Sequence, residues 1–552
     1  MLKMLQYKIE TMNPLTSPIP KTGFAGLTEN WRNDIVSGFL VFLIALPLCL
    51  GVAIASGFPA MSGVITAIIG GLLVSRINGT HVTVTGPAAG LIVVILTAVQ
   101  SLGQGDALAG YRLTLAAIVV SGVLQFGLGV FKAGRLSAFF PSTVIHGMLA
   151  AIGIIIMAKQ IPLMAGVQAL TGGVLPGIAK IPHDLVYFIP QIALIGLASL
   201  AILIFWPRIK TPSLQKIPAP ILVIIGGTVF GQLFDVAHLQ FGQDFILPKD
   251  LVLGPTFLVH IPDSLQASIV FPDFSKILSF AFWESVFAIT LVGSLETLLV
   301  AAAVDKLDPY KRYSDLNRDL RAVGIGNTVS GLLGGLPMIV EILRSSTNVN
   351  SGAKTSWSSF FHGAFMLLFV LLFPYVIDKI PLASLAALLV YAGYRLASPR
   401  TFAERMILGW AQLAIFVITI AGVLVTNILA GVLIGIVAKL LIHLLRGVSP
   451  KNMLQISYHV ERKDTDTWLF RVSGSAVFSN FISLKAEVSE VPDGKTVIFD
   501  LSEVYLIDHT VMELIDRFRQ DYIERGGVCE IAGLDQQVPF SEHVLAARRR
   551  RV

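Results

Sequence analysis

The stretch that decides the fold is residues 82–90, which read VTVTGPAAG inside an apolar block that extends to about residue 100. Its β-branched residues favour an extended backbone, and Gly86 followed by Pro87 suits the start of a helix. At the first helical position Pro87 would lose no hydrogen bond, because an N–H at that position has no intrahelical acceptor. We therefore predict a short strand followed by a half-helix within this block.

A second interrupted stretch occupies the corresponding place in the other half of the chain. Residues 334–346 read GGLPMIVEILRSS, with Pro337 in an extended arm and a helix predicted to begin near Glu341. Two half-helices whose N-termini meet inside a bilayer would each present unpaired N–H groups and about half a positive charge. That geometry favours an anion site. The alternative is that Gly and Pro only kink two ordinary membrane helices.

The composition around these stretches is that of a membrane protein. Of the 552 residues, 54% are hydrophobic and 14% are charged, whereas soluble domains carry roughly 25% charged residues. Apolar blocks of about 18 to 25 residues can each cross a bilayer as a helix. We predict an all-α polytopic membrane protein with fourteen transmembrane segments, seven in each half, near residues 34–56, 58–76, 82–100, 110–131, 137–160, 186–206, 217–234, 280–304, 318–335, 336–352, 356–377, 379–396, 410–427 and 428–446.

Charge placement gives the orientation. Basic residues accumulate in every second loop, which predicts that those loops are cytoplasmic, and no secretory signal is visible in the polar N-terminal segment. We expect a multi-pass protein of the cell inner (plasma) membrane with cytoplasmic N- and C-termini. The predicted domains are a cytoplasmic segment, 1–31, a first transmembrane repeat, 32–235, an extracellular or periplasmic loop, 236–279, a second transmembrane repeat, 280–447, and a cytoplasmic domain, 448–552.

An odd number of segments in each half makes the two halves an inverted repeat, the architecture typical of secondary transporters. The alternative is that small residues recur in any packed membrane bundle.

Three ionisable residues are predicted at membrane depth, where each costs roughly 2.5 to 3.5 kcal/mol to insert. They are Glu296 in the eighth block and Glu341 and Arg344 in the tenth. Two helix ends and Arg344 supply about two positive charges, which both glutamates would cancel if ionised. We therefore predict that a proton or Na⁺ accompanies the anion, with Glu296 and Glu341 as coupling residues. The alternative is a Glu–Arg pair that only pins two helices.

The region after about residue 451 has the pattern of a small soluble α/β domain. Strands are predicted at 467–478, 496–501 and 528–533, with helices at 478–488 and 509–525, in the order βαβαβ. This domain carries no Gly-rich phosphate loop, metal cluster or nucleophile motif, which argues against an enzyme. Cys49 and Cys529 exclude a disulfide framework and a cysteine-based zinc site. We predict no cofactor, no structural metal and no nucleic-acid partner, and we assign His146 and His362 to helix packing.

Several ordered motifs resemble the SulP family of sulfate permeases. They are ALPLCLGVAIASG from Ala45, VTVTGPAAG from Val82, SLETLLVAAAVD from Ser294, NRDLRAVGIGNTVSGLLGGLP from Asn317 and RSSTNVNSGAKT from Arg344. The tail segment VIFDLSEVYLIDHTVMELI from Val497 resembles a STAS domain, the usual appendage of that family.

The resemblance implies a fourteen-span inverted repeat divided into core and gate domains, elevator-type alternating access and a homodimer. It places the anion, sulfate or bicarbonate, between the third and tenth half-helices, flanked by the first and eighth spans. Arg344 then borders the anion, and Glu296 serves coupling. The residues expected to contact the substrate are Pro47, Thr85, Gly86, Pro87, Ala88, Val340, Glu341 and Arg344.

Departures from the family pattern leave alternatives open. Val300 replaces a Thr that helps to hold sodium in cyanobacterial bicarbonate transporters, so a Na⁺ site at Glu296 is in doubt. Leu343 replaces the usual Ser before Arg344, and His509 replaces the Ser that is phosphorylated in regulated STAS domains. A nucleobase:cation symporter shares this fold by resemblance, and a non-transporting membrane sensor that signals through STAS is a third possibility. A cytoplasmic partner of the STAS domain is also possible.

Overall fold

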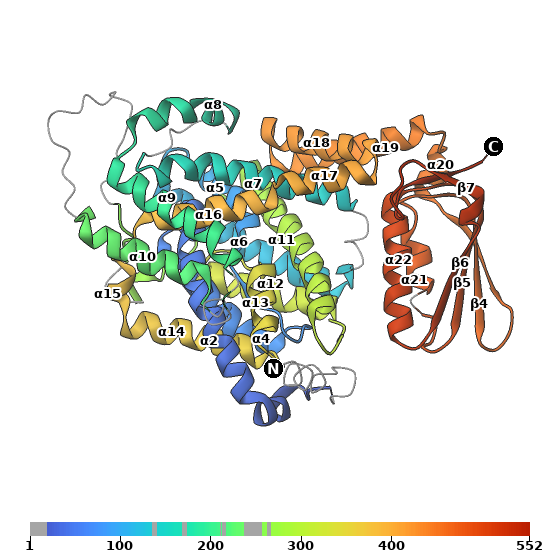
Figure 1. The fold of residues 1–552 in the computed structure, drawn as a ribbon, viewed down its shortest axis with the longest axis horizontal. Coiled ribbons are helices and arrows are strands. Elements are labelled where there is room, and N and C mark those ends of the chain that lie inside the picture. The colour runs from blue at the N-terminus through green and yellow to red at the C-terminus, as the bar shows by residue number, and fades with distance from the viewer. Residues whose placement is uncertain are drawn as a thin grey trace. The chain divides into compact units, whose positions relative to one another are not determined.

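The computed structural model describes residues 19–134, 141–167, 174–209, 211, 217–236, 257–261, 266–488 and 490–551. The chain forms two compact units (Figure 1). Unit 1 comprises Met1–Gly134 and Ile152–Tyr394, and unit 2 comprises Arg135–Ala151 and Arg395–Val552. Most of the predicted N-terminal segment and of the predicted loop at 236–279 lies outside the described residues.

Unit 1 is built from helices, most of them apolar. They are α2 (Gly23–Ala55), α3 (Ala60–Ile69), α4 (Ser75–Ile77), α5 (Ile92–Gly103), α6 (Ala107–Val130), α7 (Ser142–Met164), which begins in unit 2, α8 (Val174–Asp184), α9 (Pro190–Phe205), α10 (Ala219–Leu233), α11 (Phe280–Leu307), α12 (Leu316–Leu332), α13 (Ile342–Asn350), α14 (Trp357–Leu372), α15 (Pro374–Ile377) and α16 (Leu382–Leu396), which ends in unit 2.

The prediction of a helical, multi-pass membrane protein is confirmed. In the described part of the chain, seven helices are long and apolar enough to cross a membrane: Gly23–Ala55, Ala60–Ile77, Ala107–Val130, Ser142–Met164, Pro190–Arg208, Phe280–Asp305 and Ile428–Leu445. Shorter apolar helices cover Ala89–Gly103, Ala219–Leu233, Trp357–Leu372 and Trp410–Val425. The count of fourteen and the inverted repeat stay predictions.

The third and tenth blocks are both interrupted, as their sequences predict. Each contains a two-residue strand, β1 (Thr85–Gly86) and β2 (Ile339–Val340), and the two strands pair in antiparallel register, Thr85 with Val340 and Gly86 with Ile339. After β1 a 3₁₀ turn, η3 (Ala89–Leu91), leads into α5, and after β2 the chain enters α13. Two segments more than 250 residues apart in sequence therefore meet inside unit 1 as a strand pair flanked by two helix starts.

Unit 2 combines α17 (Pro399–Leu408), α18 (Trp410–Val425), α19 (Ile428–Leu445) and α20 (Pro450–Leu454) with an α/β domain. The domain contains β3 (Ser457–Arg462), β4 (Thr467–Ala476), α21 (Ile482–Val488), β5 (Thr496–Ile507), α22 (His509–Glu524), β6 (Val528–Ala532), β7 (Gln537–Pro539) and β8 (Arg548–Arg550). The sheet order is β3-β4-β5-β8-β7, with β6 also paired to β5.

The predicted βαβαβ order of the tail is confirmed by β4, α21, β5, α22 and β6. β4, β5 and β6 are parallel, and α21 and α22 lie on one face of the sheet (Figure 1). Phe470, Phe499 and Ile515 are buried in the core between that face and the helices. Strands β3, β7 and β8 were not predicted, because β3 is largely exposed and β7 and β8 are three residues long, so none of them carries a strong hydrophobic alternation.

Candidate functional site

The strand pair at the centre of unit 1 is extended by contacts that tie α13 to the third block. Beyond the paired residues, the Glu341 amide donates to the Val84 carbonyl at 3.0 Å. In return, the Val84 amide donates to the Ser345 hydroxyl at 2.9 Å. The predicted site residues Thr85, Gly86 and Val340 are thus brought together, all of them buried.

Polar side chains that the sequence analysis did not select hold the two extended arms. The Asn327 side chain accepts a hydrogen bond from the Met338 amide at 2.6 Å and donates to the Met338 carbonyl at 3.2 Å. Asn348 donates to the Val82 carbonyl at 2.8 Å, and Thr66 and Ser330 both donate to the Leu336 carbonyl. Because extended backbone inside a bilayer must satisfy its polar groups within the protein, these side chains are what makes the interruption possible.

Arg344 is the central charged group of the site. Its side chain is 1% exposed, and its Nη2 donates to the Pro87 carbonyl at 2.9 Å. Within the described residues, Nε and Nη1 have no hydrogen-bond partner, and no carboxylate pairs with the guanidinium. Gly86 lies against Nη1 so closely that a Cβ atom at position 86 would occupy the same space. Two buried charged donors are therefore left without a protein acceptor.

The predicted role of Pro87 as the first helical residue is wrong. The helical turn begins at Ala89, and Ala88 is extended with φ −131° and ψ 151°. Pro87 therefore belongs to the extended arm, where its carbonyl accepts the hydrogen bond from Arg344. A sequence pattern cannot show this tertiary contact, which explains the two-residue error.

Glu341 is the N-cap residue of α13 rather than its first residue. Its carboxylate accepts a hydrogen bond from the Arg344 amide at 2.7 Å. The helix starts were predicted to present unpaired amides, and at α13 one of them is instead occupied by a carboxylate of the chain itself. Glu341 thus places a negative charge at the positive end of this helix dipole, and the net potential depends on whether Glu341 is ionised.

Glu296 lies on α11 beside the start of the other half-helix. Its side chain is 5% exposed, and Oε1 has no partner in the described structure. The carboxylate abuts Gly90, where a Cβ atom would overlap it. The hydroxyls of Ser294 and Thr297 on the same helix are also buried without a partner. An unpaired buried polar atom costs about 1–3 kcal/mol, so the unpaired Glu296 oxygen, which abuts Gly90, points to a polar occupant beside α5.

Helix α2 supplies the remaining wall of the site. Pro47 is buried inside this helix, and two residues later the Cys49 thiol lies close to the Arg344 guanidinium. A contact between Pro47 and the substrate stays a prediction.

The two membrane histidines differ from each other. Nδ1 of His146 hydrogen-bonds the Ser142 carbonyl at 2.7 Å, four residues earlier in the same helix α7, so this contact does not show the predicted packing between helices. The prediction is wrong for His362, because in the described part of the chain neither of its ring nitrogens has a hydrogen-bond partner.

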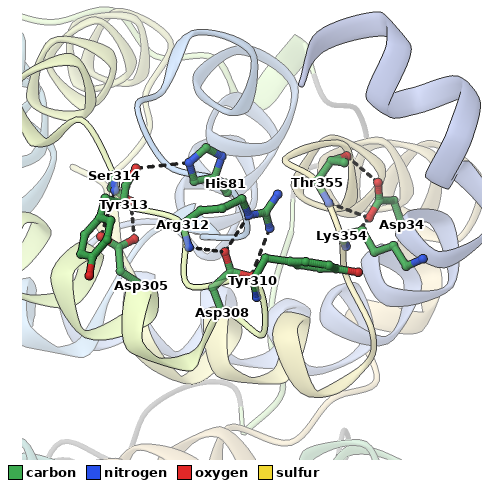
Figure 2. Close-up of polar contacts among 10 residues, drawn as sticks. All are labelled: Asp34, His81, Asp305, Asp308, Tyr310, Arg312, Tyr313, Ser314, Lys354 and Thr355. Atoms are coloured by element: carbon green, nitrogen blue, oxygen red, sulfur yellow. Dashed lines mark hydrogen bonds and ion pairs between the residues drawn. The ribbon is translucent and has the colours of Figure 1, made fainter. Parts of the chain in front are cut away.

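A second polar cluster in unit 1 surrounds the connection between α11 and α12 (Figure 2). Arg312 forms a fork with Asp308, Nε to Oδ2 at 2.7 Å and Nη2 to Oδ1 at 3.1 Å. Asp34 accepts hydrogen bonds from the Lys354 and Thr355 amides at 2.8 and 3.1 Å. Each carboxylate in this cluster meets a donor of the chain itself, so the cluster organises loops and leaves little capacity for a ligand.

The arrangement around Arg344 can bind an oxyanion. The free Nε and Nη1 donors of the guanidinium can give charge-assisted hydrogen bonds to the oxygens of a planar or tetrahedral anion, and the dipoles of α5 and α13 add positive potential at their N-termini. The described residues contain no group of three or more His, Cys, Asp or Glu that could hold a metal ion.

Comparison with known proteins identifies the family of the chain. The family model described as "Sulfate permease family" matches residues 31–421, and a STAS domain model matches residues 459–541. YbaR of Bacillus subtilis, a protein named for sulfate transport, is 27% identical over 515 residues, covering 92% of this chain and 95% of YbaR. The bicarbonate transporter BicA of Picosynechococcus sp. is 25% identical over 523 residues, covering 90% of this chain and 88% of BicA.

The fold itself is shared with a solved structure described as the overall structure of SLC26A9. The TM-score is 0.66 at 15% identity, and the match covers 96% of this chain and 88% of that one. With the family model matched from Trp31 into α18 and the STAS domain behind it, the chain belongs to the sulfate permease family, whose members are membrane anion transporters and not enzymes.

Proposed function

We propose that this protein is a secondary active transporter of sulfate or bicarbonate, coupled to H⁺ or Na⁺, with the anion held between the starts of η3–α5 and α13. The observation that carries the proposal is the Arg344 guanidinium, buried and without a carboxylate partner. A lone buried cation is costly, and a bound anion removes that cost during each transport cycle. The residues proposed to contact the anion are those predicted: Pro47, Thr85, Gly86, Pro87, Ala88, Val340, Glu341 and Arg344.

Glu296 and Glu341 are proposed to carry the coupling ion. A dianion such as sulfate brings two negative charges to a site that already contains two carboxylates and one guanidinium. Transfer of that assembly through a low-dielectric medium is unfavourable unless a cation accompanies it. A proton on Glu296 would also turn its unpaired oxygen into a donor for the anion.

The surroundings of Glu296 favour a proton over sodium. Val300, one turn after Glu296, packs with Val82, Val304 and Val349 in an apolar cluster. An oxygen-seeking cation such as Na⁺ finds no ligand at that position. We therefore propose H⁺ as the leading coupling ion and keep Na⁺ as the second candidate.

The remaining features of the proposal concern the whole chain. We propose elevator-type alternating access, a homodimer, and a location in the cell inner (plasma) membrane with both termini cytoplasmic. The proposed division is a 7+7 inverted repeat at 32–235 and 280–447, with the outside loop at 236–279 and the STAS domain at 448–552. The names of the relatives, which refer to sulfate and bicarbonate transport, support the choice of substrates.

The test is uptake by purified protein in liposomes. Labelled sulfate, bicarbonate and uracil are offered separately under an inward proton gradient, an inward sodium gradient or neither. We expect uptake of one of the two anions, accelerated by one gradient, and no uptake of uracil. Uracil uptake without anion uptake would establish the nucleobase alternative, and no uptake of any solute would favour the STAS-linked sensor.

The proposed role of Glu296 in coupling is tested with a separate variant. Glu296→Gln keeps the size of the side chain and cannot ionise, so anion uptake should continue at a reduced rate and lose its acceleration by the cation gradient. Glu284→Gln, on the same helix α11, is the matched control and should keep the full dependence. A Glu296→Gln protein with unchanged gradient dependence would contradict the role of Glu296.

A further inference from the structure

The last membrane helix carries a buried charge that the anion site does not use. Lys439 is the only Asp, Glu, Lys or Arg in α19, and its side chain is 0% exposed. Neighbouring residues of this helix, such as Leu433, Val437 and Leu441, are exposed and apolar, as expected for a surface in contact with lipid. A lysine that is fully buried needs a charged partner, since an isolated ammonium is very costly to desolvate.

In the part of the chain that the structure describes, the polar partners of Lys439 come from the STAS domain. Its Nζ lies 2.9 Å from Asp508 Oδ2 and donates to the Thr510 hydroxyl at 2.7 Å. The ammonium also lies over the Phe478 ring, 4.5 Å from its centroid. One turn further along α19, His443 Nε2 lies 3.4 Å from the same oxygen of Asp508.

Asp508 also makes hydrogen bonds within the STAS domain. It is the N-cap residue of α22, where Oδ1 accepts from the Val511 amide at 2.7 Å, and its Oδ2 accepts from the Phe478 amide at 3.0 Å. Burial alone would raise the pKa of Asp508, but Lys439 and the other donors outweigh burial and hold the pKa well below its usual range. The carboxylate that organises the start of α22 is therefore also the one that receives Lys439.

The chain between α19 and the STAS domain is also fixed. Gly447 makes the turn with φ +88°, and the Tyr505 hydroxyl donates to the Arg446 carbonyl at 3.1 Å. The Arg446 guanidinium lies 4.1 Å from the centroid of the Phe540 ring. At a separate point, Ser541 lies beside Gly409, the residue between α17 and α18. The STAS domain is thus attached to these helices at several places and not only through the connecting chain.

We propose that the Lys439–Asp508 pair docks the STAS domain onto α19 and that α17–α19 and the STAS domain move as one body during the transport cycle. Any partner that binds the STAS domain would then act directly on these membrane helices. The docking follows from the contacts above, whereas its effect on uptake rests on the proposed function.

The first experiment is a double-mutant cycle on the full-length protein. Lys439→Met leaves Asp508 buried without its cation. Asp508→Asn leaves Lys439 without its anion; the Asn oxygen can still cap α22, but its NH₂ group cannot accept the hydrogen bond from the Phe478 amide, so this variant carries that additional loss. We expect each single variant to raise hydrogen–deuterium exchange in α22 by about tenfold or more and to slow anion uptake. The double variant buries neither charge, so exchange and uptake should return towards the wild-type values.

The matched control is an ion pair on the surface of α17. Arg400 and Glu404 lie 2.9 Å apart and are largely exposed, so Arg400→Gln should change neither exchange in α22 nor uptake. Single variants at 439 and 508 that behave like this control, or effects that simply add in the double variant, would overturn the docking. If the wild-type protein takes up no anion but the single variants still alter hydrogen–deuterium exchange in α22, the docking stands and the proposed function is rejected.

The second experiment asks whether the docked state persists during transport. A Cβ atom at position 409 would lie 3.7 Å from the Ser541 Cβ, a separation that suits a disulfide. Gly409→Cys combined with Ser541→Cys should cross-link on oxidation and keep uptake within about twofold of the reduced protein, since a body that moves together tolerates the bond. Gly409→Cys alone measures the strain at this positive-φ residue. Uptake that stops on oxidation and returns on reduction would overturn the one-body proposal.

Discussion

Two buried arginines in unit 1 stand in opposite situations. Arg312, 7% exposed, is paired in a fork with Asp308 and lies 5.1 Å from the centroid of the Tyr310 ring. Arg344, 1% exposed, makes one hydrogen bond to a backbone carbonyl and meets no carboxylate in the described structure.

The difference separates a structural charge from a functional one. The Asp308–Arg312 pair is neutral as a unit, so it fixes a loop, although Nη1 of Arg312 is also buried without a hydrogen-bond partner in the described residues. Arg344 keeps its charge uncompensated, which lowers stability but creates a site where an anion is more favourable than water. Buried arginines therefore have to be judged by whether a carboxylate compensates their charge, since burial and unpartnered donors occur in both.

The largest effect is expected at Arg344. Arg344→Gln removes two charge-assisted hydrogen bonds to the anion, each worth about 1.5–3 kcal/mol, so uptake should fall by about 10²- to 10⁴-fold. Thermal stability should change little: the substitution leaves the buried Pro87 carbonyl without its donor, at a cost of about 1–3 kcal/mol, but it also removes an uncompensated buried charge. Arg344→Lys, which keeps the charge but not the fork, should retain part of the activity. Uptake near the wild-type rate in the Gln variant would show that the anion binds elsewhere.

Arg312 should show the reverse pattern. Arg312→Met leaves Asp308 buried and unpaired, at a cost of about 3–5 kcal/mol in the free energy of unfolding. Uptake per folded molecule should change much less than in Arg344→Gln. Thermal unfolding in detergent measures the first quantity, and uptake normalised to folded protein measures the second. If Arg312→Met were stable and inactive, the two arginines would have to exchange roles.

A smaller effect is expected at Gly86, which lies against the Arg344 guanidinium. Gly86→Ala places a methyl group in the space of Nη1, and such overpacking costs about 1–3 kcal/mol, enough for about a tenfold loss of anion affinity. Gly127→Ala is the control, since a Cβ atom there meets nothing within 4 Å. Affinity is measured from the concentration dependence of uptake, and equal affinities in the two variants would mean that the Arg344 side chain can move away.

The sequence predicted the interrupted blocks because Gly, Pro and β-branched residues act locally. It also identified Glu296, Glu341 and Arg344, because charge is rare in apolar blocks. The direct pairing of β1 with β2 and the contact of Pro87 with Arg344 could not be predicted, since they depend on segments more than 250 residues apart.

The partners of charged and polar residues that make tertiary contacts could not be predicted from the sequence either. The acceptor of Lys439 is in another domain, and Asn327 holds an arm 11 residues further along the chain. A single sequence does not show which polar residue in a bundle faces which neighbour.

The smallest effect concerns His81, which lies between α4 and β1 and borders the Arg312 cluster. Its Nε2 is 3.3 Å from the Tyr313 carbonyl (Figure 2). Burial, followed by the positive charge of Arg312, lowers the pKa of His81. The unfolded chain, with a His pKa of about 6.5, therefore binds more protons than the folded chain just below that pH.

The contribution of His81 to the free energy of unfolding is therefore fully present above pH ~6.5. It is lost as the pH falls through the lower pKa that His81 has in the folded state. We expect the thermal unfolding temperature to decrease as the pH falls over this range. This decrease should be smaller than the decrease caused by Arg312→Met. His81→Gln cannot be protonated and should remove this part of the pH dependence, whereas Arg344→Gln should leave it unchanged. A pH dependence that disappears with Arg344→Gln instead would mean that the two clusters are electrostatically linked, and the contrast between the paired and the unpaired arginine would then fail.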